Sequence, residues 1–141
     1  MPALPLEHLE DRARLKRYIA REQLCSLMND TKWRETMSLL QSIPNFHVRL
    51  RVKGVQEDTP PPAHWDGSFP WHLPTYESIE WLEIDPLVRR RRGMLIDDLV
   101  VDFTAQLTQV LRSIPVSFTF ENGAIRIWGY TRRGCNFDAS S

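Results

Sequence analysis

The sequence has few cysteines, few lysines and no net charge. Its two cysteines, Cys25 and Cys135, lie far apart and match neither a CxxC motif nor a zinc-ligand spacing. We therefore expect two free thiols in a reducing cytosol. The 18 basic residues, of which three are lysine, balance 18 acidic ones. This balance gives no reason to expect nonspecific binding to nucleic acids or membranes.

Long apolar runs and catalytic signatures are also absent. No run approaches the roughly 18 apolar residues of a membrane span, and the first residues become charged too early for a secretory signal. The sequence contains no GxSxG, GxGxxG or Walker loop and no RNP-like aromatic pattern. We therefore expect a cytoplasmic protein with no membrane contact, no cofactor and no catalytic residue set, and enzymatic activity is disfavoured.

The length and composition favour one globular domain. The 141 residues are 42% hydrophobic and 26% charged, which is an ordinary mixture for a folded chain. A chain of this length can bury a core without a metal or a disulfide. We expect residues 1–141 to form a single domain.

The first third of the chain predicts two helices. Apolar residues spaced by three, four and seven positions predict a helix over residues 6–27. The cluster Asn29-Asp30-Thr31 is typical of a helix start, and a second helix is expected from about Thr31 to Ser42, before Pro44. Met28 could be a second translation start, so residues 1–28 are interpreted as an N-terminal helical extension.

Three later segments predict strands. Residues 46–53 alternate between apolar and basic side chains, which is typical of a strand with one buried face. Residues 78–85 predict another strand. Residues 116–121 and 124–130 flank Asn122-Gly123, a pair that favours a two-residue hairpin turn.

One more helix completes the predicted fold. The spacing of Leu95, Leu99, Phe103, Leu107 and Leu111 predicts a helix over residues 95–114, after a basic turn formed by Arg89 to Arg92. The element order is then α-α-β-β-α-β-β. We expect an α+β fold in which an antiparallel sheet of about four strands has helices packed on one face.

A segment rich in proline and tryptophan separates the first two strands. Residues 56–76 contain five prolines and no apolar period. Because tryptophan side chains favour burial, we expect an ordered flap that lies on the domain. The flap either covers the outward face of the sheet or forms one wall of a groove beside it.

The outward face of the sheet is the predicted binding surface. The hairpin register assigns Val116, Phe118, Phe120, Ile125 and Ile127 to the core face, and Ser117, Thr119, Glu121, Arg126, Trp128 and Tyr130 to the opposite face. The strand at 46–53 adds His47, Arg49, Arg51 and Lys53 to that opposite face. Protein interfaces favour tryptophan, tyrosine and arginine. The predicted partner-binding residues are Arg49, Arg51, Trp65, Trp71, Arg126, Trp128 and Tyr130.

Two alternative functions remain open. A small hydrolase-like enzyme could use a cleft between flap and sheet, with Glu80, Glu83, His47 or His72 as titratable groups. On a regular strand Glu83 and Asp85 share one face and Glu80 points the other way. A nucleic-acid-binding domain could use Arg89 to Arg92, although the neutral total charge argues against it.

A metal site is not predicted. His64, Asp66 and His72 lie close together in the flap and are residue types that bind metals. Their spacing matches no known set of ligands, and histidine and aspartate in loops usually form local turn contacts.

Four short motifs carry a resemblance to a known family. These are Asn29-Asp30-Thr31-Lys32-Trp33, Trp65-Asp66-Gly67, Ile79-Glu80-Trp81-Leu82-Glu83-Ile84 and Ile125-Arg126-Ile127-Trp128-Gly129-Tyr130. Over about residues 29–131 the chain resembles a family of small bacterial proteins of unknown function, which implies a single-domain bacterial cytosolic protein. By analogy of size and style, we hypothesise an immunity-type inhibitor whose partner is a toxin. An exposed sheet edge could also support a homodimer.

Overall fold

A computed structural model describes residues 6–56, 65 and 74–132 of the chain. In chain order the elements are α1 (Leu6–Arg21), β1 (Cys25–Ser26), α2 (Asp30–Gln41), β2 (Leu50–Gly54), the 3-10 helix η1 (Tyr76–Ser78), β3 (Ile79–Ile84), β4 (Leu87–Arg90), β5 (Leu99–Asp102), α3 (Thr104–Ser113), β6 (Phe118–Glu121), β7 (Ala124–Trp128) and β8 (Tyr130–Thr131). The predicted order of helices and main strands is present, with two short strand pairings, β1–β8 and β4–β5, added around it.

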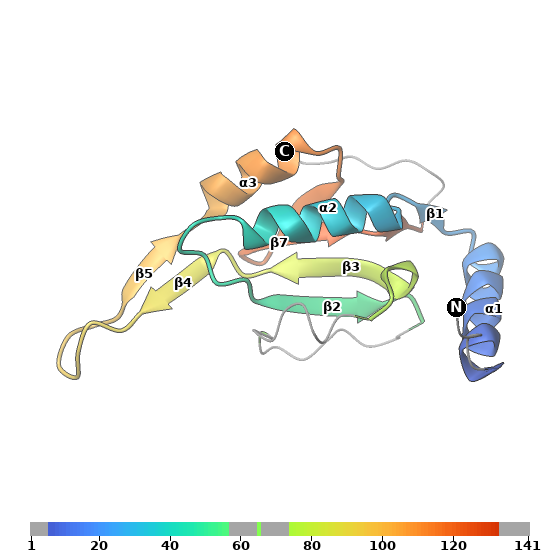
Figure 1. Ribbon diagram of the computed structural model, residues 1–141, viewed down its shortest axis with the longest axis horizontal. Helices are drawn as coiled ribbons and strands as arrows, with labels where there is room; N and C mark the ends of the chain where they lie inside the picture. Colours follow the sequence, from blue (N-terminus) through green and yellow to red (C-terminus); the bar gives the residue numbers. More distant parts are fainter. Residues whose placement is uncertain (1–5, 57–64, 66–73, 133–141) are drawn as a thin grey trace.

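The central element is an antiparallel sheet with the strand order β2-β3-β7-β6. Helices α2 and α3 lie on one face of this sheet, and α1 stands at one end of the molecule (Figure 1). The fold is therefore α+β with helices packed on one face of a four-stranded antiparallel sheet, as predicted.

Helix α2 begins where its sequence predicts. Asn29 adopts an extended backbone, and its side-chain oxygen accepts a hydrogen bond of 2.7 Å from the backbone N–H of Lys32. Trp33, Met37 and Leu40 then fall on one stripe of the helix and are buried against the sheet.

Two separate hydrophobic clusters hold the molecule together. The larger one joins the buried faces of α2 and α3 to the inner faces of β2, β3 and β7, with Leu82, Ile84, Ile125 and Ile127 at the centre of the sheet. The smaller one contains Leu15, Leu24, Val55 and Tyr130, and it attaches α1 to the end of the sheet. Helix α1 therefore packs on the domain rather than within its main core.

The β6–β7 hairpin has the predicted register. Glu121 pairs with Ala124, Phe120 with Ile125, Thr119 with Arg126 and Phe118 with Ile127. Asn122 and Gly123 have φ values of 50° and 81°, the left-handed conformation that an Asn-Gly turn supplies. The prediction is wrong for one core residue. Phe120 is 44% exposed, because β6 is an edge strand of the sheet.

The predicted helix over residues 95–114 is half wrong. Its second half is α3, but its first half belongs to an antiparallel hairpin formed by β4 and β5. Arg89 and Arg90 lie within β4 rather than in a turn, and Gly93, with φ of 146°, lies in the connection to β5. This hairpin, residues 87–102, projects from the body at the end opposite α1 (Figure 1), and we call it the arm.

Two other elements are shorter than predicted. Helix α1 ends at Arg21 instead of Leu27, because Gln23 adopts a positive φ of 54° that interrupts the helix. Strand pairing in β2 begins at Leu50, although Phe46 and Val48 are buried as their alternation predicts.

The start of α3 depends on an aspartate. The Asp102 carboxylate accepts hydrogen bonds from the backbone N–H of Thr104, at 2.9 Å, and from its hydroxyl. These bonds hold the pKa of Asp102 below its usual value. The carboxylate therefore takes the place of a helix cap, since Phe103 has no capping side chain.

We expect Asp102→Ala to lower the free energy of unfolding by about 1 kcal/mol at neutral pH. Because the folded-state pKa is lowered, this stabilisation is present above the unfolded-state pKa of about 3.9 and is lost as the pH falls through the folded-state pKa. Urea unfolding of both proteins across this pH range measures the difference. Asp102→Asn is the matched control, because it keeps an acceptor that does not titrate. A difference that does not depend on pH would contradict the assignment.

One expectation about the cysteines is wrong. Cys25 is disulfide-bonded in the structure, so the two free thiols expected from the sequence are not found. Cys135, the other cysteine of the chain, lies outside the described residues. Since disulfides persist mainly in oxidising compartments, the cytosolic location stays a prediction that this bond does not favour.

The described helices include none that combines the length and apolar character of a membrane span.

Candidate functional site

The face of the sheet opposite α2 and α3 collects charged and aromatic side chains from three strands. Strand β2 contributes Arg51 and Lys53, β3 contributes Glu80, Trp81 and Glu83, and β7 contributes Arg126 and Trp128. Arg49 and Asp85 extend the same side beyond the paired residues and form an ion pair of 3.4 Å. We call this surface the outer face.

A β-bulge brings Glu80 to the outer face. Lys53 pairs with Trp81 but its neighbour Gly54 pairs with Ile79, so Glu80 is an extra residue in β3. The bulge interrupts the alternation of side chains, and Glu80 therefore lies on the same face as Glu83. The expectation that Glu80 points the other way is wrong, because it assumed a regular strand.

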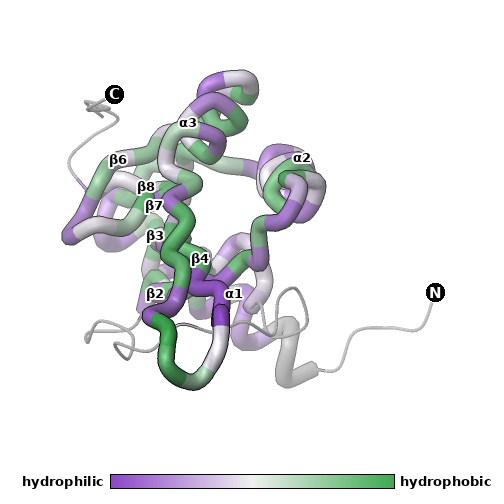
Figure 2. Tube along the Cα trace, turned by 90° about the vertical axis from the view of Figure 1, so that its left-hand side faces the viewer, coloured by the Kyte–Doolittle hydropathy of each residue, from purple (hydrophilic) through white to green (hydrophobic). Residues whose placement is uncertain are grey.

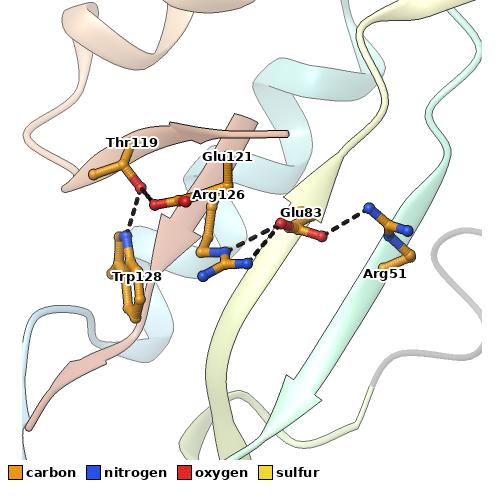
Figure 3. A network of polar contacts seen from close by, with 6 residues as sticks. All are labelled: Arg51, Glu83, Thr119, Glu121, Arg126 and Trp128. Carbon is orange, nitrogen blue, oxygen red and sulfur yellow. Dashed lines mark hydrogen bonds and ion pairs between the residues drawn. The ribbon is translucent and has the colours of Figure 1, made fainter. Parts of the chain in front are cut away.

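Glu83 is held between two arginines from the neighbouring strands (Figure 3). Its Oε1 lies 3.0 Å from Nη2 of Arg51, and its Oε2 accepts hydrogen bonds from Nε and Nη2 of Arg126 at 3.1 and 2.9 Å. The carboxylate side chain is only 5% exposed, and the two arginine side chains are about one-fifth exposed. Ion pairs this deep are much less screened by water than surface pairs.

Glu80 is held in the same way by two other cations. Nζ of Lys53 lies 2.9 Å from Oε2 of Glu80, and Nε of Arg132 donates to Oε1 at 2.7 Å. Arg132 also donates to the carbonyl oxygen of Val55. The two carboxylates thus form the centres of two ionic clusters along β3.

Aromatic rings stack against the arginines of the outer face. The guanidinium carbon of Arg126 lies 3.9 Å from the ring centroid of Trp81 and 5.2 Å from that of Trp128. The guanidinium carbon of Arg51 lies 3.9 Å from the ring centroid of Trp65. These are cation–π distances, and each guanidinium is therefore fixed both by a carboxylate and by a ring.

Trp128 is oriented by a hydrogen-bonded chain. Its indole Nε1 donates to Oγ1 of Thr119 at 2.9 Å, and this hydroxyl donates to Oε1 of Glu121 at 3.1 Å (Figure 3). The ring is partly exposed. A large side chain is therefore presented to solvent in one orientation.

The outer face is nearly neutral in spite of its many charges. It carries five cations, Arg49, Arg51, Lys53, Arg126 and Arg132, against four anions, Glu80, Glu83, Asp85 and Glu121, which leaves a net charge of +1. Long-range electrostatic attraction of a charged partner is consequently weak at this surface.

The structure brings together five of the seven predicted partner-binding residues, namely Arg49, Arg51, Trp65, Arg126 and Trp128. Tyr130 is not among them, because β7 ends at Trp128 and β8 turns to pair with β1. Its ring is buried in the smaller cluster, and its hydroxyl donates to the carbonyl oxygen of Glu77 at 2.7 Å. Burial, with the negative charges of Glu77 and Asp30, raises the pKa of Tyr130.

One further sequence candidate that the structure describes, His47, does not belong to this site. His47 is exposed and has no place in the ionic clusters. Trp71, His64, Asp66 and His72 lie outside the described residues. Within the described part of the chain, no group of three or more histidine, cysteine, aspartate or glutamate residues is placed to hold a metal ion.

Three residues of the outer face were missed from the sequence. Trp81 was not selected because its strand reads as mixed in polarity, and its pairing with Trp128 across β3 and β7 is a long-range contact. Arg132 follows the last predicted strand, so no strand periodicity assigns it to a face. The alternation of residues 46–53 places Lys53 on the correct face, but Lys53 is not among the predicted partner-binding residues. Its alternation with Arg49 and Arg51 is the signal that could have identified it.

Of the hollows at the margins of the sheet, one adjoins the outer face and another adjoins α1. The smaller one, of about 320 Å³, is lined by Glu80, Trp128, Thr131 and Arg132 and opens beside the outer face. The larger one, of about 660 Å³, lies between α1 and η1 and is lined by residues that include Leu15, Asp30, Tyr76 and Glu77.

Comparison with known proteins finds a match to the model of a family of unknown function. The model of a family of unknown function (DUF6678) matches residues 15–134. The matched segment begins within α1 and includes Leu15 and Leu24 of the smaller cluster. No curated protein and no solved structure matches the chain.

Proposed function

We propose that this chain, which belongs to the family of unknown function DUF6678, is a protein-binding module that uses its outer face. We further propose that it acts as an immunity-type inhibitor, in a bacterial cell, by covering a functional surface of a toxin. The observation that carries the first proposal is the stacked and ion-paired set of Arg126, Trp81 and Trp128 on a sheet face that no described helix covers.

The supporting argument is preorganisation. Tryptophan and arginine supply most of the binding energy at protein interfaces. A side chain that is already fixed loses little conformational entropy when a partner binds. Arg126 is fixed by Glu83 and two rings, and Trp128 is fixed by Thr119.

The ionic clusters argue against catalysis and against nucleic-acid binding at the outer face. General acid–base catalysis needs a carboxylate within reach of a substrate proton, whereas Glu80 and Glu83 are each buried and engaged by two cations. Binding of nucleic acid needs cations that can approach phosphates, and the cations of the outer face are committed to these carboxylates.

The test begins with capture of partners from the native bacterium, followed by purification of the captured protein and calorimetry of the two components. We expect a one-to-one complex, and we expect Trp128→Ala to weaken it by about 30-fold or more, as for a hot-spot residue. Arg49→Ala tests the other end of the face. Arg112→Ala, at an exposed position of α3, is the matched control and should leave the affinity unchanged.

Two further readouts distinguish the parts of the proposal. Because the outer face is nearly neutral, the affinity should change little between low and physiological salt. Inhibition of the purified partner's toxic activity supports the immunity-type role, and binding without inhibition rejects that role alone. An affinity that is unchanged by both Trp128→Ala and Arg49→Ala would show that the outer face is not the binding surface.

A further inference from the structure

The arm exposes an apolar surface that no described part of the chain covers. Its large exposed side chains are Met94, Leu95, Ile96, Leu99 and Val100, and Leu95 is 99% exposed. Figure 2, which views the molecule from the side of the arm, shows the end of the arm as a hydrophobic stretch beside a hydrophilic one. A two-stranded hairpin is marginally stable by itself in water, and exposed apolar patches of this kind mark sites of association.

The arm is held in its extended position and carries positive charge. Nη2 of Arg90 donates to the carbonyl oxygen of Asn45 at 2.9 Å, which anchors β4 to the body. Nε of Arg92 donates to the carbonyl oxygen of Asp97 at 2.9 Å, which closes the connection. Residues 89–98 contain four arginines and two aspartates, a net charge of +2. Any surface that covers the arm should therefore combine apolar and acidic groups.

A hollow with these properties lies at the opposite end of the molecule. We call it the end groove; its volume is about 660 Å³, and its lining includes Asp11, Arg12, Leu15, Asp30, Tyr76 and Glu77. Leu15 and Tyr76 supply apolar surface. Arg12 is engaged by Glu77 at 2.8 Å, and the three acids against one arginine give the lining a net charge of −2.

We propose that the arm of one copy of this chain docks into the end groove of a second copy. The apolar tip of the arm would contact Leu15 and Tyr76, and its arginines would face Asp11 and Asp30. The arm and α1 are at opposite ends of the molecule (Figure 1), so an arm does not reach the end groove of its own chain. The contact is therefore heterologous, and it leaves one free arm and one free groove on every dimer.

This inference does not depend on the proposed function, because it uses no residue of the outer face. One hairpin in one groove makes a small interface, of the size found in weak and transient complexes. We therefore expect association at protein concentrations on the order of 100 µM. Because the arm and the groove carry opposite charges, high salt should weaken it.

Sedimentation velocity of the full chain at rising concentration measures this association. The mean sedimentation coefficient of the wild type should rise with concentration, whereas Leu95→Asp, in the arm, and Asp30→Arg, in the groove, should each remain monomeric. Ala105→Asp adds the same charge at an exposed position of α3 and should associate like the wild type. Circular dichroism confirms folding of each variant, and Asp11→Arg, at a position 68% exposed, is the second groove variant if Asp30→Arg does not fold.

A mixture of the two variants gives the sharper result. Leu95→Asp retains an intact groove and Asp30→Arg retains an intact arm, so the mixture should form a one-to-one dimer that grows no further. Three results would overturn the proposal. The first is a wild type that is monomeric at every concentration. The second is self-association of both Asp30→Arg and Asp11→Arg, which would indicate contact between two arms, and the third is association that disappears after nuclease treatment, which would indicate that the arm binds nucleic acid.

Discussion

Replacement of Glu83 by alanine is expected to lower the free energy of unfolding by about 3–5 kcal/mol. The substitution removes the carboxylate that holds Arg51 and Arg126, whose side chains are four-fifths buried. Two guanidinium groups would then remain largely removed from water without their common counterion, and this uncompensated burial is the main cost. Urea unfolding followed by circular dichroism measures the change.

Two further variants isolate the role of charge. Glu83→Gln retains the shape and loses the charge, so it should also destabilise the protein substantially. Asp97→Ala removes an exposed carboxylate from the arm and should change the stability by no more than about 0.5 kcal/mol. If Glu83→Ala were as stable as the arm control, Glu83 would not be the centre of a buried ionic cluster.

Substitution of Gly129 by alanine is the second large effect that we expect. A Cβ atom at Gly129 would lie 2.2 Å from the carbonyl oxygen of Ile79 and 3.3 Å from that of Glu80. Backbone atoms cannot rotate away as a side chain can, so β3 and the end of β7 must separate. The hydrogen bond of 2.7 Å from the N–H of Gly129 to the carbonyl oxygen of Glu80 would be strained or lost. We expect a loss of about 3 kcal/mol, at the upper end for overpacked sites, in the same unfolding assay.

The matched control for this glycine lies in the hairpin turn. Gly123 has a positive φ of 81°, but a Cβ atom there would meet nothing within 4 Å. Gly123→Ala should therefore show only the backbone cost of the left-handed conformation, about 1–2 kcal/mol. A smaller effect at Gly129 than at Gly123 would mean that the close approach of the two strands is not maintained in solution.

Local signals predicted those parts of the fold that depend on local interactions. The turn at Asn122-Gly123 fixed the hairpin register, and the register placed Arg126 and Trp128 on the outer face. The alternation of residues 46–53 likewise placed Arg49 and Arg51 correctly. In both cases the side-chain period of a strand, and a turn type with a steric cause, were sufficient.

Two of the errors have the same cause, which is that a shift of one residue reverses the face of a strand. The bulge at Glu80 needs knowledge of the partner strand, since the extra residue is defined only by its pairing with β2. Tyr130 was misplaced because Gly129 ends the alternation of β7. The arm was missed for another reason: Leu95 and Leu99 also continue the helical spacing of α3, and only the pairing with β4 distinguishes the two structures.

The strand order of the sheet also affects how fast the chain reaches this structure. The hairpins β6–β7 and β4–β5 close short loops, and such hairpins form within about 1–10 µs. The central pair, β3 with β7, instead joins residues such as Glu83 and Arg126 that are 43 positions apart. Closing this long loop has an entropic cost that must be met before the pairing is stabilised. The search for the β3–β7 register should therefore limit the folding rate, and during that search the apolar side chains of the arm are exposed to other nascent chains.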